Sequence, residues 1–214
     1  MNEAYLIIPL LAIISIINNL SMKLQLASGG KIMIYMFGII GIPIHEFSHF
    51  LFCKIFGHKV TEAKFFSPNW ETGVMGYIQH TYNRNNIFQS IGQVFISIAP
   101  MIVGTFLITI LYNAFGISNI GLKSILDNPT LAIKCITFVY IFVCISSYMI
   151  CSIQDFKNCF TGIIYTIVCI IVCMFLFPGV FAVAYNGLIF VLKLTIINLA
   201  LSVLMFLILG TNKK

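Results

Sequence analysis

The chain has 214 residues, of which 60% are hydrophobic and only 8% are charged, and its mean hydropathy is +1.03. A soluble globular domain usually carries about 25% charged residues, so this composition excludes that class and predicts an integral membrane protein. The net charge of +6 does not indicate a nucleic-acid partner. The basic residues are scattered singly near the ends of apolar segments, where they act as topology signals and anchors to lipid headgroups.

Six apolar stretches are long enough to cross a bilayer, which takes about 20 residues in a helix. In chain order they cover residues 4–22, 32–56, 87–115, 131–151, 162–183 and 188–209. Turn-rich breaks separate them at residues 28–30, 57–86, 127–129 and 185–187. We therefore expect an all-α polytopic membrane protein in which residues 1–214 form a single integral membrane domain.

The loops between these stretches also predict an orientation. Six spans place both termini on one side of the membrane, and that side receives most of the lysines and arginines outside the spans. By the positive-inside rule this side is cytoplasmic. The first span has no basic residues before it and no cleavage site after it, so we expect it to be retained as a membrane helix.

Residues 57–86 form the one sizeable polar region, between the second and third expected helices. Residues 59–66 and 76–82 are rich in β-branched and aromatic residues, and Pro68, Asn69 and Gly73 between them are typical of turns. We expect a small β-hairpin associated with the membrane surface.

The second apolar stretch contains the sequence His45-Glu46-Phe47-Ser48-His49, which fits the pattern H-E-x-x-H. On a helix the two histidines share one face and can bind one Zn²⁺, while the glutamate acts as the general base on a zinc-activated water. Random placement would produce this pattern with roughly one chance in a thousand. Ionisable groups inside a membrane span are costly and usually functional, although a polar cluster that packs helices together is the alternative.

Two histidines leave a catalytic zinc site one protein ligand short. The candidates for the third ligand are Asp155, His80, Glu62, Glu71, Asp127 and His58. We favour Asp155, which follows the fourth span on the side where His45 and His49 are expected. Its alternative role is to cap the next helix together with Ser152. His80 is the second choice, and it could instead bind substrate or stabilise an oxyanion.

Two other features have interpretations that compete with a role in the site. Gln93, at the start of the third span, could line the site or form a hydrogen bond to a neighbouring helix, and we favour the second role. The seven cysteines include no C-x-x-C pair. We expect most of them to serve as small hydrophobic residues, with cysteine ligation of a metal as the less favoured alternative.

On the residues His45, Glu46, His49 and Asp155, the chain resembles the site-2 protease group of intramembrane zinc metalloproteases, and especially its minimal bacterial members. The resemblance implies a bacterial plasma-membrane enzyme with His45, His49 and Asp155 as zinc ligands, Glu46 as general base, and a catalytic core over about residues 30–165. It also implies that the hairpin around residues 73–82, which includes Tyr77, presents the substrate as an added strand. In place of the group's usual Leu-Asp-Gly, this chain has Gln154-Asp155-Phe156.

The expected function is therefore a zinc metalloendopeptidase that cleaves peptide bonds of substrates within or beside the membrane. The competing interpretation is a non-catalytic membrane protein, a metal-binding, interaction or transport component, that retains the motif. A transporter would often show inverted repeats, and the sequence contains none that we detect.

Overall fold

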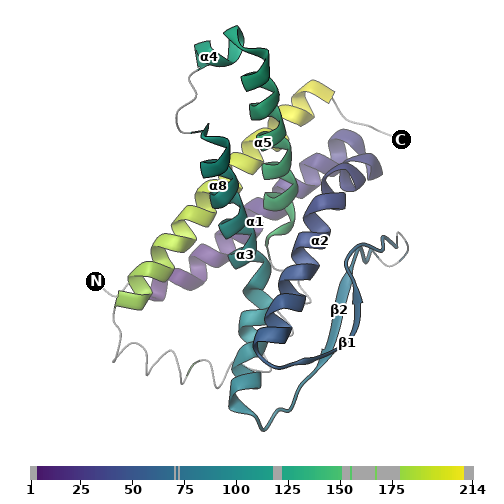
Figure 1. Ribbon diagram of the computed structural model, residues 1–214, viewed down its shortest axis with the longest axis vertical. Helices are drawn as coiled ribbons and strands as arrows, with labels where there is room; N and C mark the ends of the chain where they lie inside the picture. The colour runs from purple at the N-terminus through teal and green to yellow at the C-terminus, as the bar shows by residue number, and fades with distance from the viewer. Residues whose placement is uncertain are drawn as a thin grey trace.

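A computed structural model of the chain describes residues 4–69, 71, 73–117, 122–150, 155, 167 and 179–209. In chain order its elements are α1 (Ala4–Gly29), α2 (Lys31–Ile55), β1 (Lys59–Lys64), β2 (Tyr77–Thr81), α3 (Ile87–Phe115), α4 (Leu122–Asp127), α5 (Pro129–Tyr148) and α8 (Gly179–Leu209). The long helices form a bundle, and the two strands lie beside the second half of α2 (Figure 1).

Five of the described helices, α1, α2, α3, α5 and α8, are long and apolar enough to cross a membrane. Large apolar side chains such as Ile16, Phe106 and Leu207 point outward and are more than half exposed, as lipid-facing residues should be. The chain is therefore a multi-pass membrane protein, as its composition predicts. Most of the expected fifth span, residues 162–183, lies outside the described residues, so the described helices that can span a membrane number five and not the six expected.

Two expected boundaries are wrong. We expected a break at residues 185–187, but α8 runs from Gly179 through this segment without interruption. Gly187 costs a helix only about 1 kcal/mol, and a spanning segment must satisfy its backbone hydrogen bonds internally. The first helix extends to Gly29 and not only to residue 22, because no breaker precedes the glycine pair, and Gly30 then adopts a positive φ of 60°.

A buried polar network joins α1, α5 and α8. The Gln25 amide nitrogen donates to the Ser147 and Ser202 hydroxyls, each at 2.9 Å, and the Asn198 amide donates to Ser147 at 3.4 Å. The hydrophobic effect does not drive helices together in lipid, so such hydrogen bonds contribute to association alongside close packing. Helices α1 and α8 pack together and run in the same direction (Figure 1). When the first and last helices run in the same direction, the start of α1 and the end of α8 lie on opposite sides of a membrane. This course does not favour the cytoplasmic location of both termini, which stays a prediction.

Helix α2 packs against both α3 and α5. Its approach to α5 is very close at Gly41, where an added Cβ would overlap the Cys144 carbonyl oxygen and the Tyr148 ring. A glycine at this position allows the two backbones to come together, as small residues do in membrane bundles. This contact places the C-terminal end of α5 beside the middle of α2.

The expected hairpin is present between α2 and α3. Strands β1 and β2 pair antiparallel, with Val60 opposite His80 and Lys64 opposite Tyr77, and the register shifts between Val60 and Glu62. The pairing places residues 73–78, which enter β2, beside α2. Its association with a membrane surface stays a prediction.

Candidate metal centre

The two histidines of the H-E-x-x-H sequence lie on one face of α2, as their spacing predicts. Their Nε2 atoms are 3.0 Å apart, and the ring centroids are 4.7 Å apart in an edge-on arrangement. His49 is buried and His45 is nearly so. The intervening Glu46 is only 8% exposed.

The other ring nitrogen of each histidine faces a backbone carbonyl. His45 Nδ1 lies 2.6 Å from the Tyr148 oxygen, and His49 Nδ1 lies 2.7 Å from the Ile96 oxygen. A carbonyl oxygen can only accept, so both Nδ1 atoms must carry hydrogen, and a neutral imidazole then has a lone pair on Nε2. Carbonyl partners of this kind fix the tautomer and ring orientation of metal-ligating histidines.

Both carbonyls are available for reasons that are visible in the sequence. Tyr148 is the last residue of α5, where carbonyls lack partners within the helix. The Ile96 carbonyl lies inside α3, but the residue four positions later is Pro100, which has no N–H to donate. We did not predict the roles of Tyr148 and Ile96. A proline four residues after a position in an apolar helix is the signal that could have pointed to Ile96.

Asp155 completes the group. Its Oδ1 lies 3.2 Å from His49 Nε2, and its Oδ2 lies 3.6 Å from His45 Nε2. The ligand atoms of these three residues all lie within 4.8 Å of one another. Two imidazole lone pairs and a carboxylate thus face a common point, which a bound cation would satisfy. These residues could hold a metal ion, and nitrogen and carboxylate ligands fit Zn²⁺.

Comparisons of the chain with protein-family models, curated proteins and solved structures found no match. The resemblance to the site-2 protease group therefore rests on the residues themselves, and membership of that group stays a prediction.

The three residues border a cavity of about 770 Å³. Its walls come from α1, α2 and α3, from the end of α5, and from residues 73–78 and His80 of the hairpin region. Seven of the residues considered for the site from the sequence line this cavity, namely His45, Glu46, His49, Tyr77, His80, Gln93 and Asp155. The bundle and the hairpin therefore bring together residues from four separate parts of the chain.

The Glu46 side chain, which extends from α2, lies against the segment before β2. An added Cβ at Gly76 would lie 2.9 Å from the Glu46 Cγ atom and 2.9 Å from the Lys64 carbonyl oxygen. Glycine at this position thus allows the hairpin backbone to approach the glutamate closely. The side chain is restricted on this side and lines the same cavity as the two histidines.

His80 lines the cavity without joining the group formed by His45, His49 and Asp155. Its Nδ1 atom lies 3.0 Å from Nδ1 of His58. Burial, followed by the nearby His58 and His49, lowers the pKa of His80 to about 4, so its imidazole is neutral at neutral pH. Because His58 Nε2 donates to the Gln89 carbonyl oxygen, His80 Nδ1 is the donor in the bond to His58, and the neutral His80 ring keeps Nε2 as an acceptor. A role of His80 toward substrate stays a prediction.

The remaining predicted residues differ in their engagement. The Tyr77 hydroxyl donates to Glu62 at 2.6 Å. This bond engages both Tyr77, a candidate for substrate binding, and Glu62, a candidate for the third ligand. Gln93 is 4% exposed, and its Oε1 has no hydrogen-bond partner in the described part of the chain. Within the described residues this oxygen therefore does not make the hydrogen bond to a neighbouring helix that we favoured, and Gln93 presents a free acceptor at the cavity. Glu62, Glu71, Asp127 and His58 do not join the His45 group.

Proposed function

We propose that this chain is an intramembrane zinc metalloendopeptidase. One observation supports the proposal most directly: three side chains that could ligate a metal converge beside a buried glutamate, in a cavity lined by helices that are apolar enough to span a membrane and by the hairpin. A cluster that only packed helices together would not need three acceptor groups facing one point. It would also have no need for Glu46 next to them.

In the proposed reaction His45, His49 and Asp155 hold the ion. Zn²⁺ bound there would supply Lewis acidity, which favours ionisation of water at neutral pH and polarises a carbonyl group. Glu46 accepts the proton of the attacking water on a carboxylate oxygen and then donates it to the nitrogen of the leaving amine. The carbonyls of Tyr148 and Ile96 hold the two imidazoles in the required tautomer.

The substrate class follows from the position of the cavity among the membrane helices. A transmembrane helix hides its scissile carbonyls in its own hydrogen bonds, so a substrate must be extended locally before cleavage. The hairpin offers a way to hold it extended, because residues 73–78 border the cavity and an extended peptide can pair with a free strand edge. We therefore propose membrane-embedded or membrane-proximal peptide segments as substrates.

The test is the substitution Glu46→Gln in the purified full chain. The probes are a panel of labelled peptides with a single membrane span, and products are identified by mass spectrometry while bound zinc is measured separately. We expect the wild type to cleave members of the panel and Glu46→Gln to lose at least about 100-fold in rate while it retains zinc.

The matched control is Glu71→Gln, which removes an exposed glutamate outside the cavity and should cleave at the wild-type rate. Equal cleavage by the wild type and Glu46→Gln would overturn the proposed mechanism. Bound zinc without any cleavage by the wild type would favour the competing interpretation, a non-catalytic metal-binding membrane protein.

A further inference from the structure

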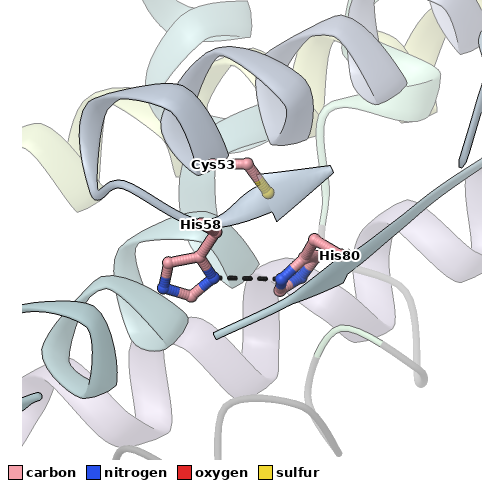
Figure 2. Close-up of side chains that lie close together, drawn as sticks. All are labelled: Cys53, His58 and His80. Carbon is pink, nitrogen blue, oxygen red and sulfur yellow. Dashed lines mark hydrogen bonds between the residues drawn. The ribbon is translucent and has the colours of Figure 1, made fainter. Parts of the chain in front are cut away.

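A second group of metal-ligating side chains lies where α2 ends and the hairpin begins. It consists of Cys53, His58 and His80, whose ligand atoms all lie within 4.8 Å of one another. Figure 2 shows the Cys53 sulfur pointing toward the two imidazole rings, which are joined by a hydrogen bond. Cys53 and His58 are both buried.

The local backbone explains why Cys53 and His58 meet. The His58 N–H donates to the Cys53 carbonyl at 2.8 Å, and the Gly57 N–H donates to the Lys54 carbonyl at 3.2 Å. Gly57 has a positive φ of 69°. This pair of bonds is a Schellman motif, which brings the residue after the glycine against the residue in the last turn of the helix. The sequence Cys53-Lys54-Ile55-Phe56-Gly57-His58 therefore builds two ligands of one site locally.

His58 is oriented in the same way as the histidines of the first group. Its Nε2 atom donates to the Gln89 carbonyl oxygen at 2.8 Å, so in the neutral ring Nδ1 has the lone pair. The Tyr82 ring stacks on His58 at 4.8 Å between centroids. The Gln89 side chain also holds the surrounding loop, since it donates to the Gly57 carbonyl and accepts from the Asn83 N–H.

The third member, His80, comes from the hairpin. It is paired with Val60 in the β1–β2 register, and this pairing holds its ring against His58. The two Nδ1 atoms are 3.0 Å apart, the same separation as the Nε2 atoms of His45 and His49. Such a separation suits two nitrogen ligands of one tetrahedral ion, for which each zinc–nitrogen bond is about 2.0–2.1 Å.

We propose that Cys53, His58 and His80 form a second, thiolate-containing metal site for Zn²⁺. One sulfur and two imidazole nitrogens are ligands that Zn²⁺ prefers, and the absence of a carboxylate from this group disfavours Mg²⁺ and Ca²⁺. Binding replaces the hydrogen bond between His58 and His80, moves the His80 proton from Nδ1 to Nε2, and releases the Cys53 thiol proton to solvent.

The site fastens the hairpin to α2 beside the first group. His45, His49 and Cys53 follow one another at intervals of four residues on α2, so each is displaced from the next by about 6 Å along the helix. His80 and residues 73–78 line the cavity of the first group. An ion at the second site thus holds the strand that forms one wall of that cavity. The inference does not depend on the proposed protease activity.

Cobalt(II) is the probe, because it occupies zinc sites and gives a thiolate-to-metal charge-transfer band in the near ultraviolet only where sulfur is a ligand. We expect the metal-free full chain to bind about two cobalt ions, one for each group of ligands, and to show this band. Cys53→Ser should bind about one ion and lose the band. Cys144→Ser, which changes a buried free cysteine of α5, should match the wild type.

Two further readouts separate this site from the first one. His45→Ala combined with His49→Ala should lose one ion and keep the charge-transfer band. Amide hydrogen exchange in β1 and β2 should slow when Zn²⁺ is added to the wild type, and the effect should be absent in Cys53→Ser. A band that persists in Cys53→Ser, or a wild type that binds cobalt without any band, would overturn the second site and leave the proposed function untouched. A wild type that binds both ions and shows the band but cleaves no peptide would overturn the proposed function and leave the second site untouched.

Discussion

His49 donates a hydrogen bond from Nδ1 to the carbonyl oxygen of Ile96, 2.7 Å away in the neighbouring helix α3. This oxygen is available because Pro100 lacks the N–H that would otherwise donate to it within the helix. The bond directs His49 Nε2 toward His45 and Asp155. A proline in one helix thereby orients a candidate metal ligand in another.

Replacing this proline should weaken metal binding without unfolding the chain. In Pro100→Ala the new N–H competes with His49 for the Ile96 carbonyl, while the helix itself becomes more regular. We expect zinc affinity at the first group to fall roughly 10- to 100-fold, the usual cost of losing a partner behind a metal ligand, with thermal stability unchanged or higher. Competition with a zinc chelator measures the affinity. Pro9→Ala, in α1, is the control, and an equal loss there would contradict the explanation.

The close contact between α2 and α5 should tolerate no side chain at Gly41. An added Cβ would overlap the Cys144 carbonyl oxygen, and overpacking of this kind costs about 1–3 kcal/mol. We expect Gly41→Ala to be destabilised by that amount in thermal or denaturant unfolding. It should also lose zinc affinity, because Tyr148 moves away from His45.

Gly187 in α8 is the matched control for Gly41. No atom lies within 4 Å of its added Cβ, and the residue is helical. Gly187→Ala should therefore leave metal binding unchanged and raise stability by up to about 1 kcal/mol through helix propensity. A destabilised Gly187→Ala would indicate that the segment 185–187 is a break after all.

The contact between Gly76 and Glu46 should matter for turnover more than for metal binding. In Gly76→Ala the methyl group would press on the Glu46 Cγ atom and on the Lys64 and Phe65 carbonyl oxygens. We expect the cleavage rate to fall by about tenfold or more, since misplacement of a catalytic group by about 1 Å can cost 100-fold, while zinc content stays at the wild-type value. A loss of zinc in parallel with activity would instead indicate a general distortion of the cavity.

The polar network between α1, α5 and α8 should contribute measurably to stability. Gln25→Leu removes the amide that donates to both Ser147 and Ser202, so each of these buried hydroxyls loses a hydrogen bond. We expect a loss of about 1–2 kcal/mol in detergent unfolding, within the range measured for hydrogen bonds between membrane helices. Asn186→Leu, at an exposed position of α8, should show no such loss.

The fold class and the position of the hairpin could be predicted from the sequence because they depend on local patterns. Apolar length determines which segments can span lipid, and a polar interval with turn residues determines where the chain leaves it. Helix ends were predicted less well. The chain continues as helix through Met22–Ser28 and through Tyr185–Gly187, because weak breakers do not outweigh the need to satisfy every backbone group in lipid.

In the candidate site, too, some features depend on local sequence and others on contacts between distant segments. The sequence by itself determined that His45 and His49 share a helix face with Glu46 between them, because the helical repeat alone places them there. Only the tertiary structure decided that Asp155 faces them while His80 turns to His58, and that the carbonyls of Tyr148 and Ile96 hold the rings. Contacts between distant segments depend on how closely helices can approach, as at Gly41, and on which backbone groups remain unpaired once the helices have formed.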